Sequence, residues 1–275
     1  MTQTVSVEDR KRRMALSFDS IAEHYEELRF VHACARRLVE LADIQSNARV
    51  LDVGTGTGLV ALAAASLVGR TGRVVGVDFS PEMLVRARAN TKIANLEQIE
   101  FVQGDAENLE FPDSSFDMVL FASSLFFVPD MQKAILESLR VLKPGGRLGF
   151  SSFGAGFLSP LSSLLTARLE THGVPPANPP VTRLADADVC RKLLEDAGFE
   201  RLEVIQEQVG YHHQNLEARW TEILAGLEGI PLTKLPPEVR EQVKAEHFAE
   251  LKALETPDGL WMNVPANFVF GRKPN

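Results

Sequence analysis

The sequence predicts one α/β domain, built on a parallel sheet and carrying insertions that form a lid. Its 275 residues are 45% hydrophobic and 24% charged, close to the averages for soluble globular proteins. Short β-rich runs alternate with helical patterns of about ten to fifteen residues, which is typical of a parallel sheet with helices on both faces. A glycine-rich turn joins the first strand of this repeat to its first helix.

The elements can be assigned in order along the chain. We expect helices over Ser17 to Leu28 and about Val31 to Ala42, after some twenty polar residues. From Arg49 the repeat begins with the strand RVLDVG, the break GTGTG and the helix LVALAAASLVG. The further strands are expected in RVVGVDFS, IEFVQGDAENL, FDMVLFASSL and RLGFSSF, and the further helices in PEMLVRARANTKIA and MQKAILESLRVL.

Two stretches do not fit the repeat, one at about 154–182 and the other at about 210–257. Each contains apolar residues at helical spacing, for example LSSLLTARLE in the first. Between them we expect a helix over 186–197 and a strand over 201–209, and after them the strand ANFVFGRK. Insertions of this kind usually lie near the ligand crevice of an open sheet, which favours a lid or substrate pocket. Packing against the core would also explain either stretch.

Charge and composition exclude several classes of function. The net charge of -8 disfavours nucleic-acid binding, and the basic run Arg10 to Arg13 is interpreted as the solvated face of a first helix. No apolar run approaches the roughly 18 to 20 residues that span a bilayer, and the N-terminus lacks a secretion signal. We therefore expect a cytoplasmic protein without membrane or nucleic-acid partners. Cys34 and Cys190 indicate buried, reduced thiols and no metal site.

The strongest motif is VLDVGTGTG at 50–58, an apolar strand followed by three alternating glycines. Glycines there permit positive φ and a close ligand, and the helix that follows offers unpaired N–H groups. Dinucleotide enzymes use the related spacing GxGxxG, whereas this turn reads GxGxG. Asp52 would repel a pyrophosphate but suits an ammonium and a sulfonium, which disfavours an NAD dehydrogenase. The residues expected to bind the ligand here are Asp52, Gly54, Thr55 and Gly56.

Two further acids lie at successive strand ends. Asp78 closes VVGVD and can accept both ribose hydroxyls of an adenosine, although NAD enzymes place an acid similarly. Gly104-Asp105-Ala106 closes IEFVQ, where an acid can accept from the adenine amine while a backbone N–H meets a ring nitrogen. Three acids at successive strand ends together indicate a site for a nucleoside ligand.

Four motifs in register carry a resemblance to a known family, namely VLDVGTGTG, VVGVDFSPEML, GDAENLEFPDSSFDMV and LRVLKPGGRL. From about Phe18 to Phe153 the chain resembles class I S-adenosylmethionine-dependent methyltransferases, particularly the branch with the ubiquinone/menaquinone-biosynthesis C-methyltransferases. The resemblance implies a Rossmann-like, doubly wound, seven-stranded sheet with an antiparallel last strand, plus helical lid insertions. It also implies helices in 1–48 that close over S-adenosylmethionine, a catalytic core in 49–275, and a small-molecule methyl acceptor.

The same resemblance implies roles for individual residues. Gly54 and Gly56 would contact the methionine part of the cofactor, and the carbonyl of Ala122 would face its ammonium group. Tyr25, in FDSIAEHYEEL, is similar to a tyrosine that closes over the cofactor in this branch. The residues implied around the adenosine are Asp78, Phe79, Met83, Asp105 and Ala106.

The chain departs from the family pattern after the fourth strand. Many relatives carry a His pair before Val-Pro-Asp, whereas FFVPD stands here at 126–130, so no histidine base is available at that point. Methyltransferases that act on the amino groups of nucleobases or glutamine carry Asn/Asp-Pro-Pro-Tyr/Phe after that strand, and this chain has Ser123-Ser124-Leu125. Asn178-Pro179-Pro180 is interpreted as a plain loop.

Methyl transfer from a sulfonium is an in-line displacement, so alignment in a dry pocket can supply most of the rate without a base. No catalytic residue is assigned, and the candidate bases are His24, His32, His172, His212 and His213. The candidate wall of an apolar acceptor pocket is Phe126, Phe127, Phe153, Phe157, Trp220 and Trp261. We expect C- or O-methylation, but the acceptor and the oligomeric state stay open. A non-methylating enzyme of the same fold, or a non-catalytic S-adenosylmethionine-binding module, are the alternatives.

Overall fold

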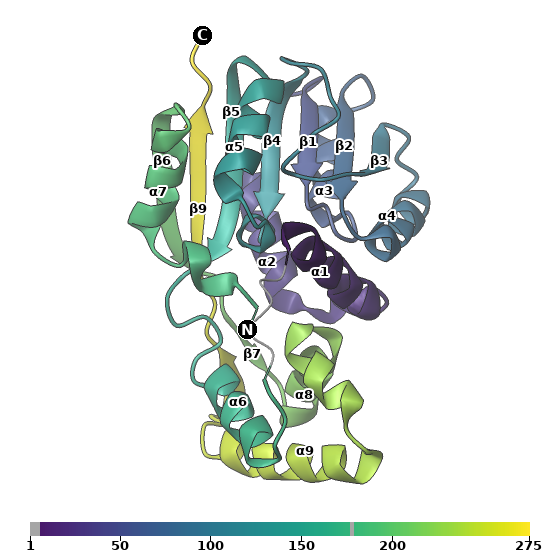
Figure 1. The fold of residues 1–275 in the computed structure, drawn as a ribbon, viewed down its shortest axis with the longest axis vertical. Helices are drawn as coiled ribbons and strands as arrows, with labels where there is room; N and C mark the ends of the chain where they lie inside the picture. The colour runs from purple at the N-terminus through teal and green to yellow at the C-terminus, as the bar shows by residue number, and fades with distance from the viewer. Residues whose placement is uncertain (1–5, 177–178) are drawn as a thin grey trace.

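The computed structural model describes residues 6–176 and 179–275, which are built around a seven-stranded sheet (Figure 1). The strands are β1 Arg49–Val53, β2 Arg73–Asp78, β3 Ile99–Gln103, β4 Phe116–Ala122, β5 Leu142–Phe153, β6 Glu200–Gln208 and β9 Pro265–Arg272. Their order is β3-β2-β1-β4-β5-β9-β6. β9 is antiparallel to β5 and β6, and the remaining pairs are parallel. The predicted α/β class and the antiparallel last strand are confirmed.

Helices cover both faces of this sheet. The α-helices of the described residues are α1 Val7–Ile21, α2 Arg29–Leu41, α3 Leu59–Val68, α4 Pro81–Ala94, α5 Met131–Val141, α6 Leu161–Thr171, α7 Ala187–Asp196, α8 Leu216–Ala225 and α9 Pro237–Lys252, of which α6, α8 and α9 lie beyond the strand ends. α2, α3 and α4 are neighbours on one face, and α5 and α7 are neighbours on the other. This is the doubly wound arrangement that alternating strands and helices predict.

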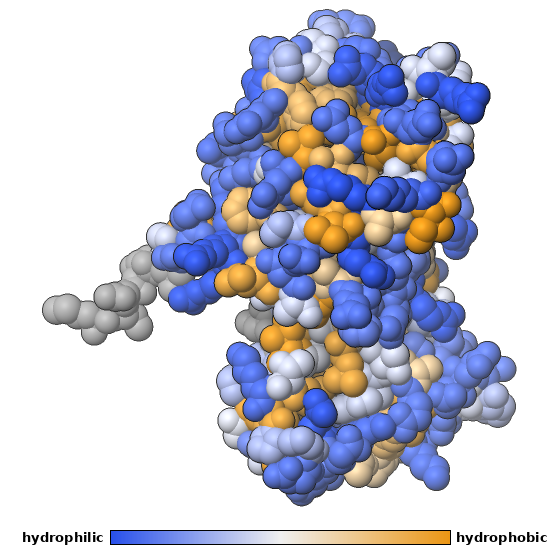
Figure 2. Space-filling view, turned by 90° about the vertical axis from the view of Figure 1, so that its right-hand side faces the viewer, coloured by the Kyte–Doolittle hydropathy of each residue, from blue (hydrophilic) through white to orange (hydrophobic). Residues whose placement is uncertain are grey.

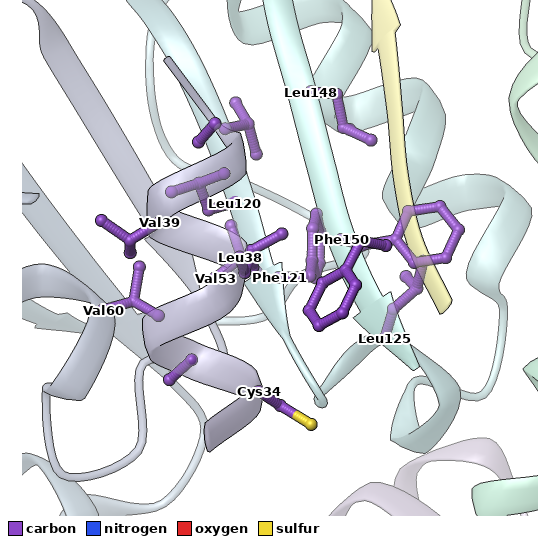
Figure 3. Close-up of a cluster of buried hydrophobic side chains, with 14 of the residues drawn as sticks. Cys34, Leu38, Val39, Val53, Val60, Leu120, Phe121, Leu125, Leu148 and Phe150 are labelled. Atoms are coloured by element: carbon purple, nitrogen blue, oxygen red, sulfur yellow. The ribbon is translucent and has the colours of Figure 1, made fainter. Parts of the chain in front are cut away.

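The main hydrophobic core lies where α2 packs against the middle of the sheet (Figure 3). Cys34 and Leu38 of α2 belong to one buried cluster with Leu120 of β4 and Phe150 of β5, and all four are fully buried. Burying side chains of this size stabilises a fold by about 1.5–3 kcal/mol each, so α2 is anchored to the strands that carry the site. Cys34 and Cys190 are both buried and unpaired, as predicted.

The predicted bounds of the first helix were wrong. α1 begins at Val7, where the Ser6 side chain accepts from the Asp9 N–H as an N-cap, and it ends at Ile21. The residues up to Leu28 form turns and a short 3-10 helix, Tyr25–Glu27. The charged residues in the first half of α1 are good helix formers, but because they are so many, the apolar periodicity of the helix is hard to recognise in the sequence. α2, in contrast, lies within two residues of its predicted bounds.

The two insertions meet beyond the strand ends and form a lid of α6, α8 and α9 (Figure 1). Leu165 and Leu169 of α6 share a small core with Trp220 and Ile223 of α8. Arg168 of α6 also pairs with α9. The lid includes a two-stranded ribbon that the sequence analysis did not expect, β7 Tyr211–His213 against β8 Leu260–Met262.

The outer surface mixes polar and apolar residues. On the face drawn in Figure 2, hydrophilic residues cover most of the area, and hydrophobic ones gather in several separate groups. Scattered groups of this kind are normal on folded proteins. In the described part of the chain, no helix combines the length and apolar character needed to cross a membrane.

Gly76, inside β2, leaves room for the Phe101 ring, and filling that room tests the packing. A Cβ at position 76 would lie 2.6 Å from Phe101 Cδ1 and 2.8 Å from Thr55 Oγ1. We expect Gly76→Ala to lower the free energy of unfolding by about 1–3 kcal/mol, measured by urea denaturation. The cost should be smaller in a Phe101→Leu background, and equal costs in both backgrounds would contradict a clash with the ring.

Candidate functional site

A cavity lies at the carboxyl ends of β1, β2, β3 and β4, where the strand order reverses between β1 and β4. Open α/β sheets bind ligands at this point because the connections after the two neighbouring strands run in opposite directions, which creates a crevice between them. We call it the strand-end cavity. Its wall consists of residues at or just after each of these strands, together with one face of α1.

The structure brings together most of the residues predicted to bind the cofactor. Ten of the twelve line the strand-end cavity, namely Tyr25, Gly54, Gly56, Asp78, Phe79, Met83, Gly104, Asp105, Ala106 and Ala122. Asp52 and Thr55 do not line it and are buried in the turn. Residues that are up to about 100 positions apart in sequence therefore share one wall.

The glycine turn has the backbone geometry that a close ligand needs. Gly54 and Gly56 have φ values of +70° and +54°, which favour glycine. A Cβ on Gly54 would lie 2.5 Å from Ser124 Cβ, so no side chain fits between the ends of β1 and β4. The Ser124 hydroxyl donates to the Val53 carbonyl over 2.9 Å, which holds these two ends together.

Asp78 is held in place by the backbone around it. One carboxylate oxygen accepts from the Gly56 N–H over 2.8 Å, and the other accepts from the Ser80 N–H over 2.9 Å. A carboxylate has about four acceptor positions, so Asp78 can accept further hydrogen bonds from a ligand. Burial raises the pKa of Asp78, and the backbone donors oppose that change. The arrangement suits a pair of ribose hydroxyls.

Asp52 links the glycine turn to the start of α3. Its Oδ2 accepts from the Thr55 hydroxyl over 2.6 Å and from the Ala61 N–H over 3.1 Å. Its Oδ1 accepts no hydrogen bond from the described residues. Burial raises the pKa of Asp52 to about 7. Asp52 was predicted to contact the ligand, but its carboxylate contacts Thr55 in the glycine turn and Ala61 in the first turn of α3 instead.

One face of α1 covers the cavity; sequence analysis expected helices in 1–48 over the cofactor but did not name the residues of this face. Lys11, Met14, Ala15 and Phe18 line the cavity at helical spacing. Lys11 Nζ lies 2.6 Å from Asp105 Oδ2 and 2.8 Å from Glu107 Oε2. The interpretation of the basic run as a solvated face is therefore wrong for Lys11, whose side chain is 11% exposed. The helical spacing of these residues was a usable signal in the sequence, but the charged residues between them masked it.

A second cavity, which we call the lid cavity, adjoins the first. The two share Phe18, Tyr25, Ser123 and Phe127 in their walls. Most of the lid cavity's lining is apolar and comes from α1, α2, the end of β5, α6 and the segment after α8. Tyr25 and Phe127 therefore lie between the chamber that holds Asp78 and the mostly apolar chamber under the lid.

Three of the six aromatic residues proposed for an acceptor pocket line the lid cavity, namely Phe127, Phe153 and Phe157. Phe126 is buried beside Phe127, with 4.7 Å between the ring centroids. Trp220 belongs to the lid core, and Trp261 lies at the surface against His212. Pro179 also lines the cavity, whereas Asn178 is outside the described residues.

None of the five candidate histidines lines either cavity, although all of them are described. His24, His172 and His213 each contact a glutamate, and His32 contacts the Glu26 carbonyl. His212 packs against the Trp261 ring, with 4.9 Å between centroids. Histidine base catalysis therefore has no support from the placement of these side chains.

The raised pKa of Asp52 predicts a pH-dependent stability. A buried carboxyl with a raised pKa stabilises the fold fully below pH 3.8, and this contribution is lost as the pH rises through about 7. In Asp52→Asn the side-chain oxygen can keep both hydrogen bonds, and there is no proton to lose. We expect the unfolding free energy of this variant, relative to wild type, to rise by roughly 2–3 kcal/mol between pH 5 and pH 8. A difference that stays constant in denaturant titrations across this range would contradict the burial of a titrating carboxyl.

Comparison with known proteins identifies the family. A family described as "Methyltransferase domain" matches residues 44–177. The ubiquinone/menaquinone biosynthesis C-methyltransferase UbiE of Escherichia coli is 32% identical over 222 residues, which cover 73% of this chain and 88% of that protein.

Solved structures agree on the fold. The YcgJ protein of Bacillus subtilis aligns with a TM-score of 0.62 and 22% identity, over 89% of this chain and 99% of that one. A SAM-dependent methyltransferase from Aquifex aeolicus aligns with a TM-score of 0.53 and 16% identity, over 87% and 89%. With the identity to UbiE, the chain belongs to the S-adenosylmethionine-dependent methyltransferases, in the group that includes the ubiquinone/menaquinone biosynthesis C-methyltransferases.

Proposed function

We propose that this enzyme binds S-adenosylmethionine in the strand-end cavity and methylates a small, largely apolar molecule in the lid cavity, on carbon or oxygen. The observation that carries this proposal is the wall of Phe18, Tyr25, Ser123 and Phe127, which the strand-end cavity and the lid cavity share. A methyl donor in the strand-end cavity and a methyl acceptor in the lid cavity would meet at this shared wall.

The residues of the strand-end cavity suit the parts of the cofactor. Asp78, with free acceptor positions at the end of β2, would accept the ribose hydroxyls. Gly54 and Gly56 would let the methionine part lie against the backbone, and the Ala122 carbonyl would accept from its ammonium group. The adenine would lie among Phe79, Met83, Gly104, Asp105 and Ala106. When bound, the cofactor supplies a methyl group already activated by its sulfonium.

The acceptor chamber supports catalysis by alignment. Its lining is mostly aromatic and aliphatic, and an ordered approach in a largely apolar chamber can supply much of the rate of an in-line transfer. Tyr25 and Phe127 would fix the direction of that approach because they line both chambers. The named reaction of UbiE makes a carbon atom the first acceptor to test. The net charge of -8 supports a small molecule over a nucleic acid.

Parallel calorimetric titrations with S-adenosylmethionine, S-adenosylhomocysteine and NAD test the cofactor first. We expect the first two to bind and NAD not to bind. Incubation with S-adenosylmethionine and a series of phenols and quinols should then release S-adenosylhomocysteine together with a methylated product. Preference for NAD, or binding of none of the three, would contradict the proposal.

Asp78→Ala tests the ribose contact. We expect it to weaken S-adenosylhomocysteine binding by about 1–3 kcal/mol, the scale for removing a partner of buried polar groups. Asp258→Ala removes an exposed acid in a turn and should leave affinity unchanged. Calorimetry gives both affinities, and circular dichroism shows whether each variant is folded. Unchanged affinity in a folded Asp78→Ala protein would contradict the assignment.

A further inference from the structure

The lid cavity is lined mostly by apolar side chains and a few hydroxyls, and its only charged groups among the described residues are two carboxylates from the lid. These are Glu222 in α8 and Glu228 just after it. Among the described residues that line this cavity there is no lysine, arginine or histidine. The charged groups that a ligand can touch there are therefore negative.

Both carboxylate oxygens of Glu222 have hydrogen-bond partners within the protein. Its Oε1 accepts from the Arg29 N–H over 2.9 Å and from the Tyr211 hydroxyl. Its Oε2 lies 2.8 Å from His213 Nε2, and its side chain is 2% exposed. Glu222 therefore ties α2 and β7 to α8 and has little capacity left for a ligand.

Glu228 is only half partnered. Its Oε2 accepts from Arg219 Nη2 over 2.8 Å. Its Oε1 is buried and accepts no hydrogen bond from the described residues. A buried acceptor without a donor is costly, so most such atoms in folded proteins have a partner. The Glu228 side chain as a whole is 19% exposed and lines the lid cavity, where a donor group on a bound ligand can approach it.

Arg219 raises the opposite possibility, that the ligand is an anion. Its Nε and Nη1 also lack hydrogen-bond partners among the described residues. However, Arg219 is fully buried and does not line the cavity, whereas both glutamates do. Arg219 is also close to both carboxylates, at 2.8 Å from Glu228 and 3.8 Å from Glu222. Its charge is therefore balanced inside the lid.

We propose that the methyl acceptor carries a hydrogen-bond donor, a hydroxyl or a protonated amine, on an apolar body, and that Glu228 binds this group. Acceptors with a carboxylate or phosphate in the same place would be excluded by like charge. The inference rests on the proposed function and deepens it. Because Glu228 lines only the lid cavity and not the strand-end cavity, it holds a part of the acceptor away from the transferred methyl. Glu228 is a specificity-determining residue and not a base.

Three naphthalene probes of matched shape test the donor requirement. They are 2-naphthol, 2-naphthylmethylamine and 2-naphthoate, titrated at neutral pH into the full-length protein saturated with S-adenosylhomocysteine. Hydrogen bonds to charged groups are the stronger class, so we expect the two donors to bind about tenfold or more tighter than 2-naphthoate. This comparison uses the wild-type protein and does not depend on any variant.

Glu228→Gln tests the residue itself. It keeps the size of the side chain but removes its charge, so the preference for donors over 2-naphthoate should fall to within about threefold. The affinity for S-adenosylhomocysteine should not change. The matched control is Glu217→Gln, which makes the same change at a 66% exposed acid in the preceding helix, α8, and should keep the wild-type preference. Thermal unfolding checks that each variant is folded.

The outcomes separate this inference from the proposed function. If S-adenosylhomocysteine does not bind, the proposed function fails. If it binds, but 2-naphthoate binds as tightly as the donors or no probe binds, only the inference about the acceptor is overturned. A donor preference that survives in folded Glu228→Gln would overturn the role of Glu228.

Discussion

The close approach of β4 to the turn after β1 is the constraint on which the site depends. Gly54 leaves no space for a side chain next to Ser124, and the Ser124 hydroxyl binds the carbonyl of Val53. Asp52 holds the same turn from the α3 side, and Asp78 holds it from β2. The turn is thus fixed from three directions before any ligand binds, and its backbone is presented to the cavity in one geometry.

The two cavities are built by different means. The strand-end cavity depends on backbone geometry at the ends of parallel strands, and its charged residues are held by short local hydrogen bonds. The lid cavity depends on side chains brought together from several segments, with aromatic rings on one side and the Glu222 and Glu228 carboxylates on the other. α1 joins the two, because Phe18 lines both and Lys11 pairs with Asp105.

The sequence predicted the features that leave a local trace. Alternating glycines indicate a tight turn, and acids at strand ends lie at one edge of a parallel sheet. Gly54, Asp78 and Asp105 were therefore correctly predicted to lie together, and they share the wall of the strand-end cavity. The sequence does not show in which direction a side chain points. Asp52 was predicted to face the ligand, but its carboxylate contacts Thr55 and Ala61. β7 and β8 have three residues each, too few to show a period of two. The Glu228 contacts depend on how the lid packs, which spacing alone does not reveal.

The sheet order has a consequence for how the chain reaches this structure. β6 is an edge strand whose partner in the sheet is β9, and the second insertion lies between them in sequence. During synthesis β6 therefore emerges with no strand beside it, and it cannot join the sheet until the whole lid has followed and β9 has paired with β5. Pairings this distant in sequence are slow because the loop must close before any contact repays its entropy. Assembly of β1 to β5, which carry the strand-end cavity, can precede this step, so the part of the chain that completes the lid is the later one to mature.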